Sequence, residues 1–469
     1  MNTTVDSAGQ LNEIQTSSET PKEAAGPITA AERILTLDVL RGFALFGIMF
    51  VNVHAMVHPD AWFDIAWSTL SAGDYGFEAF KILFTQGKFY TLFAFLFGLG
   101  FAVQLDRAEK KGVRFAGRFF WRILLLWFIG VTHMILIWDG DILNTYAVGG
   151  LFLLFFFGCK RGLDRLVRRF SKKRDKLPRW TALVVSFLLI FGLFGGGYFA
   201  FQGQIAAVED LKARAVAGEE LSEEEQERYD RIVHRESEAG RAEQAEQRAE
   251  TRAVYTDGSY LDTVEFRAGR FANRAISGPF WLVIAGIFIL GAYFGRNNFI
   301  GRAAELKGGF KKLLWISLIA GLPLTSLFLY VNILSEHETG FSILRFAGFF
   351  LKTASGLAFA LFFVAAITLG MLGSAQRWLK WFAPVGRMAL TNYIMQSIIG
   401  TFFFYGWGLG MMEHFNNGLE LVYMITIFAF QTWFSIWWLE RYRFGPLEWL
   451  WRSGTYLKWQ PIRKAAVTA

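Results

Sequence analysis

Long apolar segments, separated by polar ones, follow one another through most of the chain. About ten of them, each of roughly 18–25 residues, are long enough to cross a bilayer as helices. We expect these helices at 39–57, 82–104, 119–138, 142–159, 181–201, 279–295, 313–334, 350–372, 388–407 and 419–439. The pattern predicts an all-α fold, a polytopic transmembrane bundle of about ten spanning helices with a charged helical extracytoplasmic insertion.

The polar segments divide the chain into five parts. We expect a disordered cytoplasmic tail at 1–33, membrane halves of about five helices each at 34–201 and 274–440, the insertion at 202–273, and a cytoplasmic interfacial helix and tail at 441–469. Within the insertion, residues 219–252 place opposite charges three or four residues apart, which favours solvated helix. We expect a charged helical hairpin over the membrane domain, and the alternative is an arm that docks a protein partner.

Lysine and arginine are concentrated in every second loop. They follow the second, fourth, sixth, eighth and tenth predicted helices, whereas the other loops carry acids such as Asp60, Asp64, Glu336 and Glu338. The positive-inside rule then places both termini in the cytoplasm and the insertion outside. We therefore expect a multi-pass protein of a cytoplasmic (inner) membrane.

Composition excludes several other classes of protein. Hydrophobic residues make up 53% of the chain and aromatic residues 17%, with 50 phenylalanines. A soluble enzyme could not cover so much apolar surface, and a disordered chain would not carry it. The net charge of +8 then indicates basic loops beside a lipid bilayer rather than nucleic-acid binding. The single cysteine, Cys159, excludes an intramolecular disulfide and a thiolate zinc cluster.

The first predicted helix carries polar residues that bilayers disfavour, which makes them candidates for substrate binding. Asp38 and Arg41 lie three residues apart and can pair at the cytoplasmic end. Asn52 follows Arg41 after three helical turns, about 16 Å further along nearly the same face. The alternative is structural: an interfacial ion pair, and a hydrogen bond between helices from Asn52.

All six histidines lie on the predicted outer side, and two of them are candidates for acid–base catalysis. His133 and His54 each lie near the outer end of a predicted helix, and imidazole titrates near neutral pH. Asp139 and Asp141 follow His133 across a tight turn and are candidates to orient its ring. The alternative for Asp141 is an N-cap of the next helix. No metal site is expected, because His54 and His58 lack a Glu or Cys ligand set at metal-site spacing.

Three further polar residues in predicted helices are candidates to bind substrate. Lys88 lies in the outer half of the second helix, where it can bind an anion or extend its amine to the interface. Asn392 and Gln396 share one face of the ninth helix, and the alternative there is hydrogen bonding to a neighbouring helix. Neither a nucleophile elbow nor a phosphate-binding loop is present.

Several motifs together resemble the YeiB-like family of bacterial polytopic membrane proteins. They are TLDVLRGFALFGI at 36–48, GKF at 87–89, FLFGLG at 95–100, WDGDIL at 138–143, GRMALTNY at 386–393 and RFGPLEWLWR at 443–452. The first helix is also similar to that of transmembrane acyltransferases. Those enzymes pass an acyl group from cytoplasmic acyl-CoA to an acceptor on the far side through a histidine in the membrane. The bacterial O-acyltransferases have histidine where this chain has Asn52, whereas the animal N-acetyltransferases have asparagine there.

The resemblance implies an acyltransferase that modifies an extracytoplasmic glycan, lipid or small molecule. Arg41 would steer the donor, His133 or His54 would take the acceptor proton, and Lys88 or Asn52 would line the path. Acyl-CoA would be a co-substrate, and no tightly bound cofactor is expected. The alternatives are a transporter or exporter of an anionic solute and a non-catalytic envelope assembly protein.

Overall fold

The computed structural model describes residues 34–59, 67–170, 180–275, 280–337 and 342–464. Within these ranges the regular secondary structure is helical, apart from one isolated bridge between Tyr442 and Arg463. Expectations for the tail at 1–33, for Asp60, Asp64 and Glu338, and for part of the basic loop, 171–179, lie outside the described residues.

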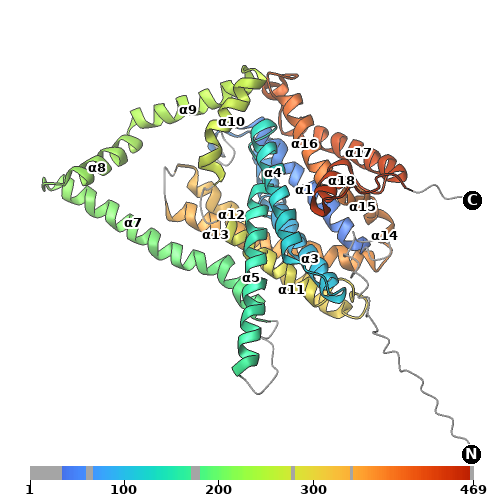
Figure 1. Cartoon of the computed structure of the whole chain (residues 1–469). Helices are drawn as coiled ribbons and strands as arrows, with labels where there is room; N and C mark the ends of the chain where they lie inside the picture. Colours follow the sequence, from blue (N-terminus) through green and yellow to red (C-terminus); the bar gives the residue numbers. More distant parts are fainter. Residues whose placement is uncertain (1–33, 60–66, 171–179, 276–279, 338–341, 465–469) are drawn as a thin grey trace, which may run out of the picture.

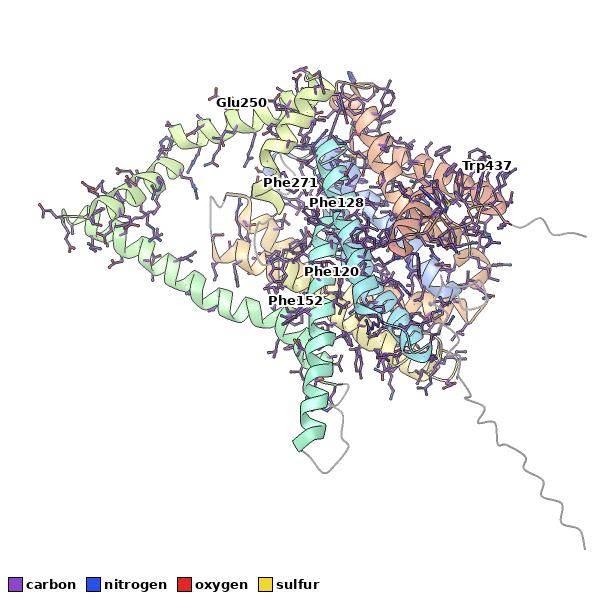
Figure 2. All side chains as sticks on the ribbon, viewed as in Figure 1. Phe120, Phe128, Phe152, Glu250, Phe271 and Trp437 are labelled. Atoms are coloured by element: carbon purple, nitrogen blue, oxygen red, sulfur yellow. The ribbon has the colours of Figure 1, made fainter. Side chains whose placement is uncertain are left out.

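In the described part of the chain, six helical segments are long and apolar enough to cross a membrane: Leu35–Val57, Ala72–Lys110, Ala116–Leu136, Lys307–Leu334, Ile343–Met371 and Asn417–Arg441. Shorter apolar helices occupy Leu143–Cys159, Thr181–Gly192 and Phe280–Arg296. Large aromatic side chains on these segments, such as Phe120, Phe128 and Trp437 (Figure 2), remain 49%, 53% and 39% exposed. Lipid accommodates such surfaces at no cost, and the chain is a multi-pass helical membrane protein.

The N-terminal part contains the first half of the bundle. Its helices are α1 (Leu35–Val57), α2 (Ala72–Phe84), α3 (Lys88–Lys110), α4 (Ala116–Leu136), α5 (Leu143–Phe170) and α6 (Thr181–Phe187). A π-helical stretch, Leu188–Gly192, joins α6 to α7 (Leu193–Val216). The helix expected at 82–104 is therefore wrong in one respect, because the chain breaks before Lys88 where Gly87 adopts φ 83°. Only glycine takes this left-handed conformation without strain.

The C-terminal part completes the bundle and contains several short helices. Its elements are α11 (Phe280–Arg296), α12 (Lys307–Leu334), α13 (Ile343–Met371), α14 (Gln376–Leu379), α15 (Phe382–Arg387), α16 (Ala389–Phe404), α17 (Asn417–Arg441) and α18 (Pro446–Tyr456). The two membrane halves interleave, since α1 packs on α15, α16 and α17 while α3 packs on α11 and α13 (Figure 1).

The insertion forms an arm instead of a hairpin. Figure 1 shows α7 leaving the bundle and α8 (Glu223–Glu236), α9 (Glu238–Thr256) and α10 (Tyr260–Ala275) returning to it. The arm carries few large apolar side chains that could pack two of its helices into a hairpin. Its helices α8 and α9 begin at the side-chain caps Ser222 and Ser237. The expected boundary at 201/202 lies inside the continuous helix α7.

The returning end of the arm is fixed to the end of α4. Arg267 is 1% exposed, and its guanidinium donates to the carbonyl oxygens of Ile135 at 2.9 Å and Leu136 at 3.4 Å. The Tyr260 hydroxyl donates to the Leu136 carbonyl at 2.8 Å. The last carbonyl oxygens of a helix have no hydrogen-bond donors within that helix, and at the end of α4 the arm supplies these donors.

Two glycines bring α1 and α15 into backbone contact. A Cβ atom at Gly42 would collide with the carbonyl oxygen of Phe382, and one at Gly386 would collide with that of Asp38. Small residues permit such close packing between membrane helices. This contact fixes the first turns of α1, which carry Asp38 and Arg41.

Candidate functional site

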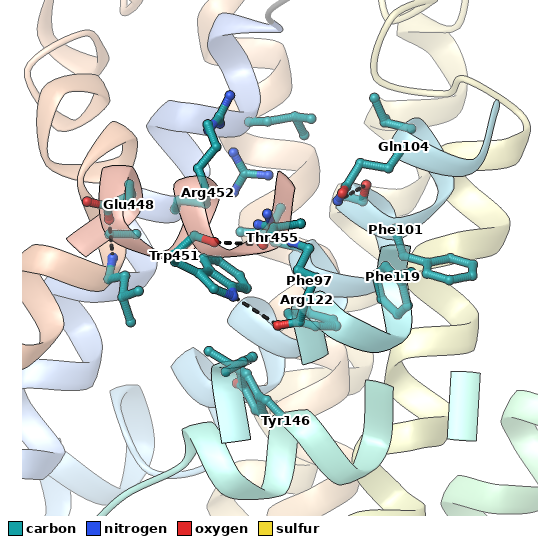
Figure 3. A pocket seen from close by; sticks show the side chains of 18 of the residues that line it. Phe97, Phe101, Gln104, Phe119, Arg122, Tyr146, Glu448, Trp451, Arg452 and Thr455 are labelled. Atoms are coloured by element: carbon teal, nitrogen blue, oxygen red, sulfur yellow. Dashed lines mark hydrogen bonds between the residues drawn. The ribbon is translucent and has the colours of Figure 1, made fainter. Parts of the chain in front are cut away.

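A cavity of about 300 Å³ lies among α1, α3, α4, α5, α15, α16 and α18 (Figure 3). We call it the arginine cavity, because seven arginines line it: Arg41, Arg107, Arg114, Arg118, Arg122, Arg387 and Arg452. The carboxylates in its lining are Asp38 and Glu448. The ionisable side chains of the lining thus carry a formal charge of +5, which attracts a polyanion.

The arginines come from separate elements, and Arg122 on α4 is held in place by contacts with Trp451 on α18. The guanidinium of Arg122 lies over the Trp451 ring, 3.6 Å from its centroid, and the Trp451 indole donates to the Arg122 carbonyl at 2.9 Å (Figure 3). Arg122 also interacts electrostatically with Arg452 and Arg41. Three cations from α4, α18 and α1 therefore act on one region of the cavity.

Asp38 and Arg41 pair as the sequence indicates. An Arg41 guanidinium nitrogen lies 3.2 Å from the Asp38 carboxylate, with side-chain exposures of 31% and 2% respectively. Both residues line the arginine cavity. Arg41 is thus partly exposed and Asp38 is buried, and the pair belongs to the candidate site.

Glu448 connects α18 to the beginning of α16. Its carboxylate accepts hydrogen bonds from the backbone amides of Leu390 at 2.6 Å and Thr391 at 3.1 Å, and from the Thr391 hydroxyl at 2.6 Å. A carboxylate at this position caps the α16 amides. Burial raises the pKa of Glu448, and the Thr391 and Leu390 hydrogen bonds oppose that shift. The short helix expected at the chain's C-terminal end is thereby attached to the bundle as one wall of the cavity.

The far part of the cavity is apolar. Leu45, Ile48, Phe93, Leu126 and Leu143 line it together with the rings of Tyr146 and Tyr393. The Tyr146 hydroxyl donates to the Tyr90 carbonyl at 2.7 Å. The cavity therefore combines a cationic part with an apolar part, a lining suited to a ligand with anionic and apolar portions.

Beyond Tyr393 lies a buried histidine–carboxylate pair. The His133 Nδ1 atom is 2.9 Å from a carboxylate oxygen of Asp141, and the two side chains are 1% and 0% exposed. The other Asp141 oxygen accepts from the Asn144 amide at 2.8 Å and from its side chain at 2.9 Å. Asp141 thus fulfils both roles considered for it, because it orients His133 and caps the first turn of α5.

The second ring nitrogen of His133 is available. Its Nε2 atom is buried and has no hydrogen-bond partner among the described residues. The Tyr393 ring lies 5.3 Å from the His133 ring, centroid to centroid. Since Tyr393 also lines the arginine cavity, one aromatic side chain links the cavity to the pair.

Asp139 does not share in this pair. Its carboxylate accepts a hydrogen bond from the Tyr255 hydroxyl at 3.1 Å. Tyr255 lies on α9, near the returning end of the arm. Asp139 therefore connects the arm to the turn that follows α4, while the contact to His133 comes from Asp141.

His54 lies in a different polar cluster. Its Nδ1 atom is 2.7 Å from the Lys81 amine and 3.6 Å from a Glu420 carboxylate oxygen. His58 Nε2 is 3.6 Å from the other Glu420 oxygen, and Lys81 pairs with Glu78 at 2.5 Å. We call His54, His58 and Glu420, with Lys81 and Glu78, the His54 cluster. None of its members lines the arginine cavity.

Lys88 neither binds at the cavity nor extends to the interface. The side chain is fully buried, and its amine donates to the Ile82 carbonyl at 2.6 Å and to the Thr325 hydroxyl at 2.8 Å. The amine thus satisfies a backbone carbonyl at the end of α2, where the helix breaks.

The remaining candidates lie outside the cavity lining. Asn392 donates to the Ser435 hydroxyl at 2.9 Å, and Gln396 donates to the Gln431 side chain at 2.9 Å, so both connect α16 to α17. The buried Asn52 Nδ2 atom has no hydrogen-bond partner among the described residues. The structure thus groups Asp38 with Arg41 and His133 with Asp141, and separates the other six candidates from these pairs.

Sequence reasoning did not assign Arg107, Arg114, Arg118, Arg122, Arg387, Arg452, Glu448 and Tyr393 to a site. The sequence shows the arginines as residues of basic loops. The four-residue spacing of Arg118 and Arg122 is a signal that could have assigned these two to one helix face. Their convergence depends on how α4, α15 and α18 meet, and no local pattern records that arrangement.

These features define a multi-pass α-helical membrane protein with an arginine-lined cavity and a buried His–Asp pair. A family model described as protein of unknown function (DUF418) matches residues 294–458. The uncharacterized protein YxaH of Bacillus subtilis is 32% identical over 446 residues, covering 93% of this chain and 98% of the relative. The uncharacterized protein YeiB of Escherichia coli is 29% identical over 439 residues, covering 90% and 96%. The chain belongs to this YeiB-like, DUF418 family, and no solved structure matches it.

Proposed function

We propose that the protein is a membrane-bound acyltransferase that passes an acyl group from acyl-CoA to an extracytoplasmic glycan, lipid or small molecule. The observation that carries the proposal is the position of the arginine cavity: its apolar part ends at Tyr393, which packs on the ring of His133. A site for a polyanionic donor and a candidate base are thereby adjacent.

The donor's chemistry matches the two parts of the cavity. Acyl-CoA carries phosphate groups at one end and an acyl thioester at the other, joined by a long flexible arm. Arginine guanidiniums bind phosphate oxygens through two parallel hydrogen bonds, and Arg41, Arg122 and Arg452 supply such groups. The apolar part would receive the acyl end, so that the thioester approaches Tyr393 and His133.

His133 would act as the general base. Asp141 holds the Nδ1 proton, which leaves Nε2 to accept the proton of the acceptor hydroxyl or amine. The deprotonated acceptor attacks the thioester carbonyl carbon, and the carbon–sulfur bond breaks. The CoA thiolate leaves and takes up the proton from His133. His54 is less suited to this role, because its Nδ1 atom already contacts Lys81.

This mechanism requires a defined orientation in the membrane. We infer from the positive-inside rule that both termini and the arginine-lined end of the cavity face the cytoplasm, where acyl-CoA is made, and that the arm lies on the outer side. We assign the protein on this basis to the bacterial cytoplasmic (inner) membrane. Acyl-CoA is consumed as a co-substrate, and the lipid bilayer is the protein's environment.

The donor site is tested by calorimetric titration of the purified protein with acetyl-CoA. Arg41→Ala should weaken binding by roughly 1.5–3 kcal/mol, the value of a charge-assisted hydrogen bond, and Arg41→Lys should recover only part of it. Arg302→Ala is the matched control, since Arg302 pairs with Glu305 and does not line the cavity. Wild-type protein that gives no heat with acetyl-CoA would contradict the proposal and favour an exporter of another anion.

Transport is less well supported by the helix breaks. Transporters use broken helices whose free backbone groups face a binding cavity. At the break between α2 and α3, the Lys88 amine binds the Ile82 carbonyl within the protein. A non-catalytic role in envelope assembly, with a protein partner on the arm at 202–273, is also less well supported, because it gives the arginine cavity no ligand.

A further inference from the structure

We propose that His54, His58 and Glu420 form a binding site for a divalent transition-metal ion, with Zn²⁺ as the first candidate. The proposal concerns the His54 cluster and is independent of acyl transfer. One ligand atom from each of the three residues lies within 4.8 Å of the other two. Two imidazoles and one carboxylate, with a position left open, are a ligand set typical of zinc.

The ligands come from two helices that pack against each other. His54 lies in the last turn of α1 and His58, four residues later, is the C-cap residue of that helix; their rings lie 4.7 Å apart between centroids. Metal-binding histidine pairs on helices use the same spacing. Glu420 lies in the first turn of α17, and its two oxygens are each 3.6 Å from one of the imidazoles. The third ligand that the sequence lacks near the histidines therefore arrives from a segment more than 350 residues away in the chain.

The charges in the cluster favour a cation. Glu420 and Glu78 are both buried, with side-chain exposures of 2% and 7%, and Lys81 pairs with Glu78. The Glu78 Oε2 atom and the Glu420 Oε1 atom are buried and have no hydrogen-bond partner among the described residues. With neutral imidazoles, the two carboxylates and one ammonium of the His54 cluster sum to a formal charge of −1 in a buried site. Such a charge is costly unless it is paired or bound to a metal.

Lys81 competes with the metal for His54. Its amine is 2.7 Å from His54 Nδ1 and 2.5 Å from Glu78. Metal binding would leave Lys81 paired with Glu78 alone and would place Glu420 on the ion. Lys81 thus makes the site weaker than its ligands alone would, and its removal should strengthen binding.

Competition with a chromophoric chelator would measure Zn²⁺ binding by full-length protein that has been stripped of metal in detergent. Wild-type protein should bind one Zn²⁺ per chain, and Mg²⁺ should not displace it, because Mg²⁺ prefers oxygen ligands. His58→Ala should weaken binding by roughly 100-fold or more, since even the groups that orient ligands contribute about 10–100-fold. His58 is 38% exposed, so this variant should fold. His414→Ala, an exposed histidine outside the cluster, is the control and should bind as the wild type does.

Lys81→Met provides an independent test with the opposite sign. This change removes the competing cation and should tighten Zn²⁺ binding at least several-fold. It should also increase the rise in melting temperature that Zn²⁺ causes, because a ligand stabilises the state that binds it. The proposal is overturned if wild-type protein binds no Zn²⁺, or if His58→Ala binds it as tightly as the wild type.

Discussion

Asp141 binds two partners at once, and this shapes what substitutions near His133 should do. One of its oxygens orients the His133 ring and the other caps the first turn of α5. Changing Asp141 should therefore alter stability together with the proposed catalysis, because a buried cap contributes about 0.5–2 kcal/mol. His133 itself is the cleaner residue for testing the proposed base.

His133→Gln should lower acetyl transfer from acetyl-CoA to envelope material by ~10²–10⁴-fold, the usual contribution of a general base. Its melting temperature should stay near the wild-type value, because glutamine can still donate to Asp141. Transfer of radiolabelled acetyl groups measures the effect on activity, and thermal unfolding of the purified protein measures the effect on stability. Asp139→Asn is the control: it should loosen the contact with Tyr255 and leave transfer near the wild-type rate. A His133→Gln protein that unfolds easily but transfers normally would assign His133 a structural role.

Among the helices, the contact between α1 and α15 positions Arg41, the arginine proposed to bind the donor. Gly42 and Gly386 face each other's backbone, and Asp38 and Arg41 lie on the same turns of α1. The positions of Asp38 and Arg41 in the cavity lining therefore depend on the two glycines.

Gly386→Ala should destabilise the protein by about 1–3 kcal/mol, because the added methyl group overlaps the Asp38 carbonyl and the helices must separate. The same change should weaken acetyl-CoA binding, since Arg41 moves with α1. Thermal unfolding and titration measure the two effects. Gly117→Ala on α4 is the control, because no atom lies within 4 Å of its added Cβ; it should be neutral or stabilising by up to about 1 kcal/mol. An equal response of the two variants would show that the α1–α15 contact is not tight.

For the whole molecule, the orientation in the membrane determines which face meets the donor. The alternation of basic and acidic loops predicts that residues 160–180 face the cytoplasm and the arm faces outward. The arm also reaches the bundle at the end of α4 that carries His133, so this orientation would put His133 on the outer side.

Cysteine labelling in intact cells tests this orientation. In a Cys159→Ser background, an impermeant thiol reagent should label Asp230→Cys on the arm and should fail to label Lys172→Cys until the cells are opened. Asp230 lies on α8 and is accessible along the arm. Labelling of position 172 with protection of position 230 in intact cells would reverse the assigned topology.

The fold class could be predicted from the sequence for a physical reason, whereas the family was indicated by its motifs. Spanning helices satisfy their own backbone hydrogen bonds, so each one appears in the chain as a continuous apolar run. All ten expected segments contain helix, and six helical segments of the described chain meet the length and hydropathy of a membrane span. The apolar pattern does not predict the break before Lys88, because this break depends on the φ of Gly87 and on a contact with Thr325, which is distant in the chain.

The sequence predicted the candidate sites only in part. Asp38 with Arg41, and His133 with Asp141, are separated by three and eight residues, so local spacing brings their side chains together. The arginine cavity and the His54 cluster join residues from α1, α4, α17 and α18, whose contacts arise from packing across the whole chain. The sequence by itself determined the spanning helices and the polar residues within them. The tertiary structure alone decided which of those residues share a site, because helices distant in the chain meet only when the bundle packs.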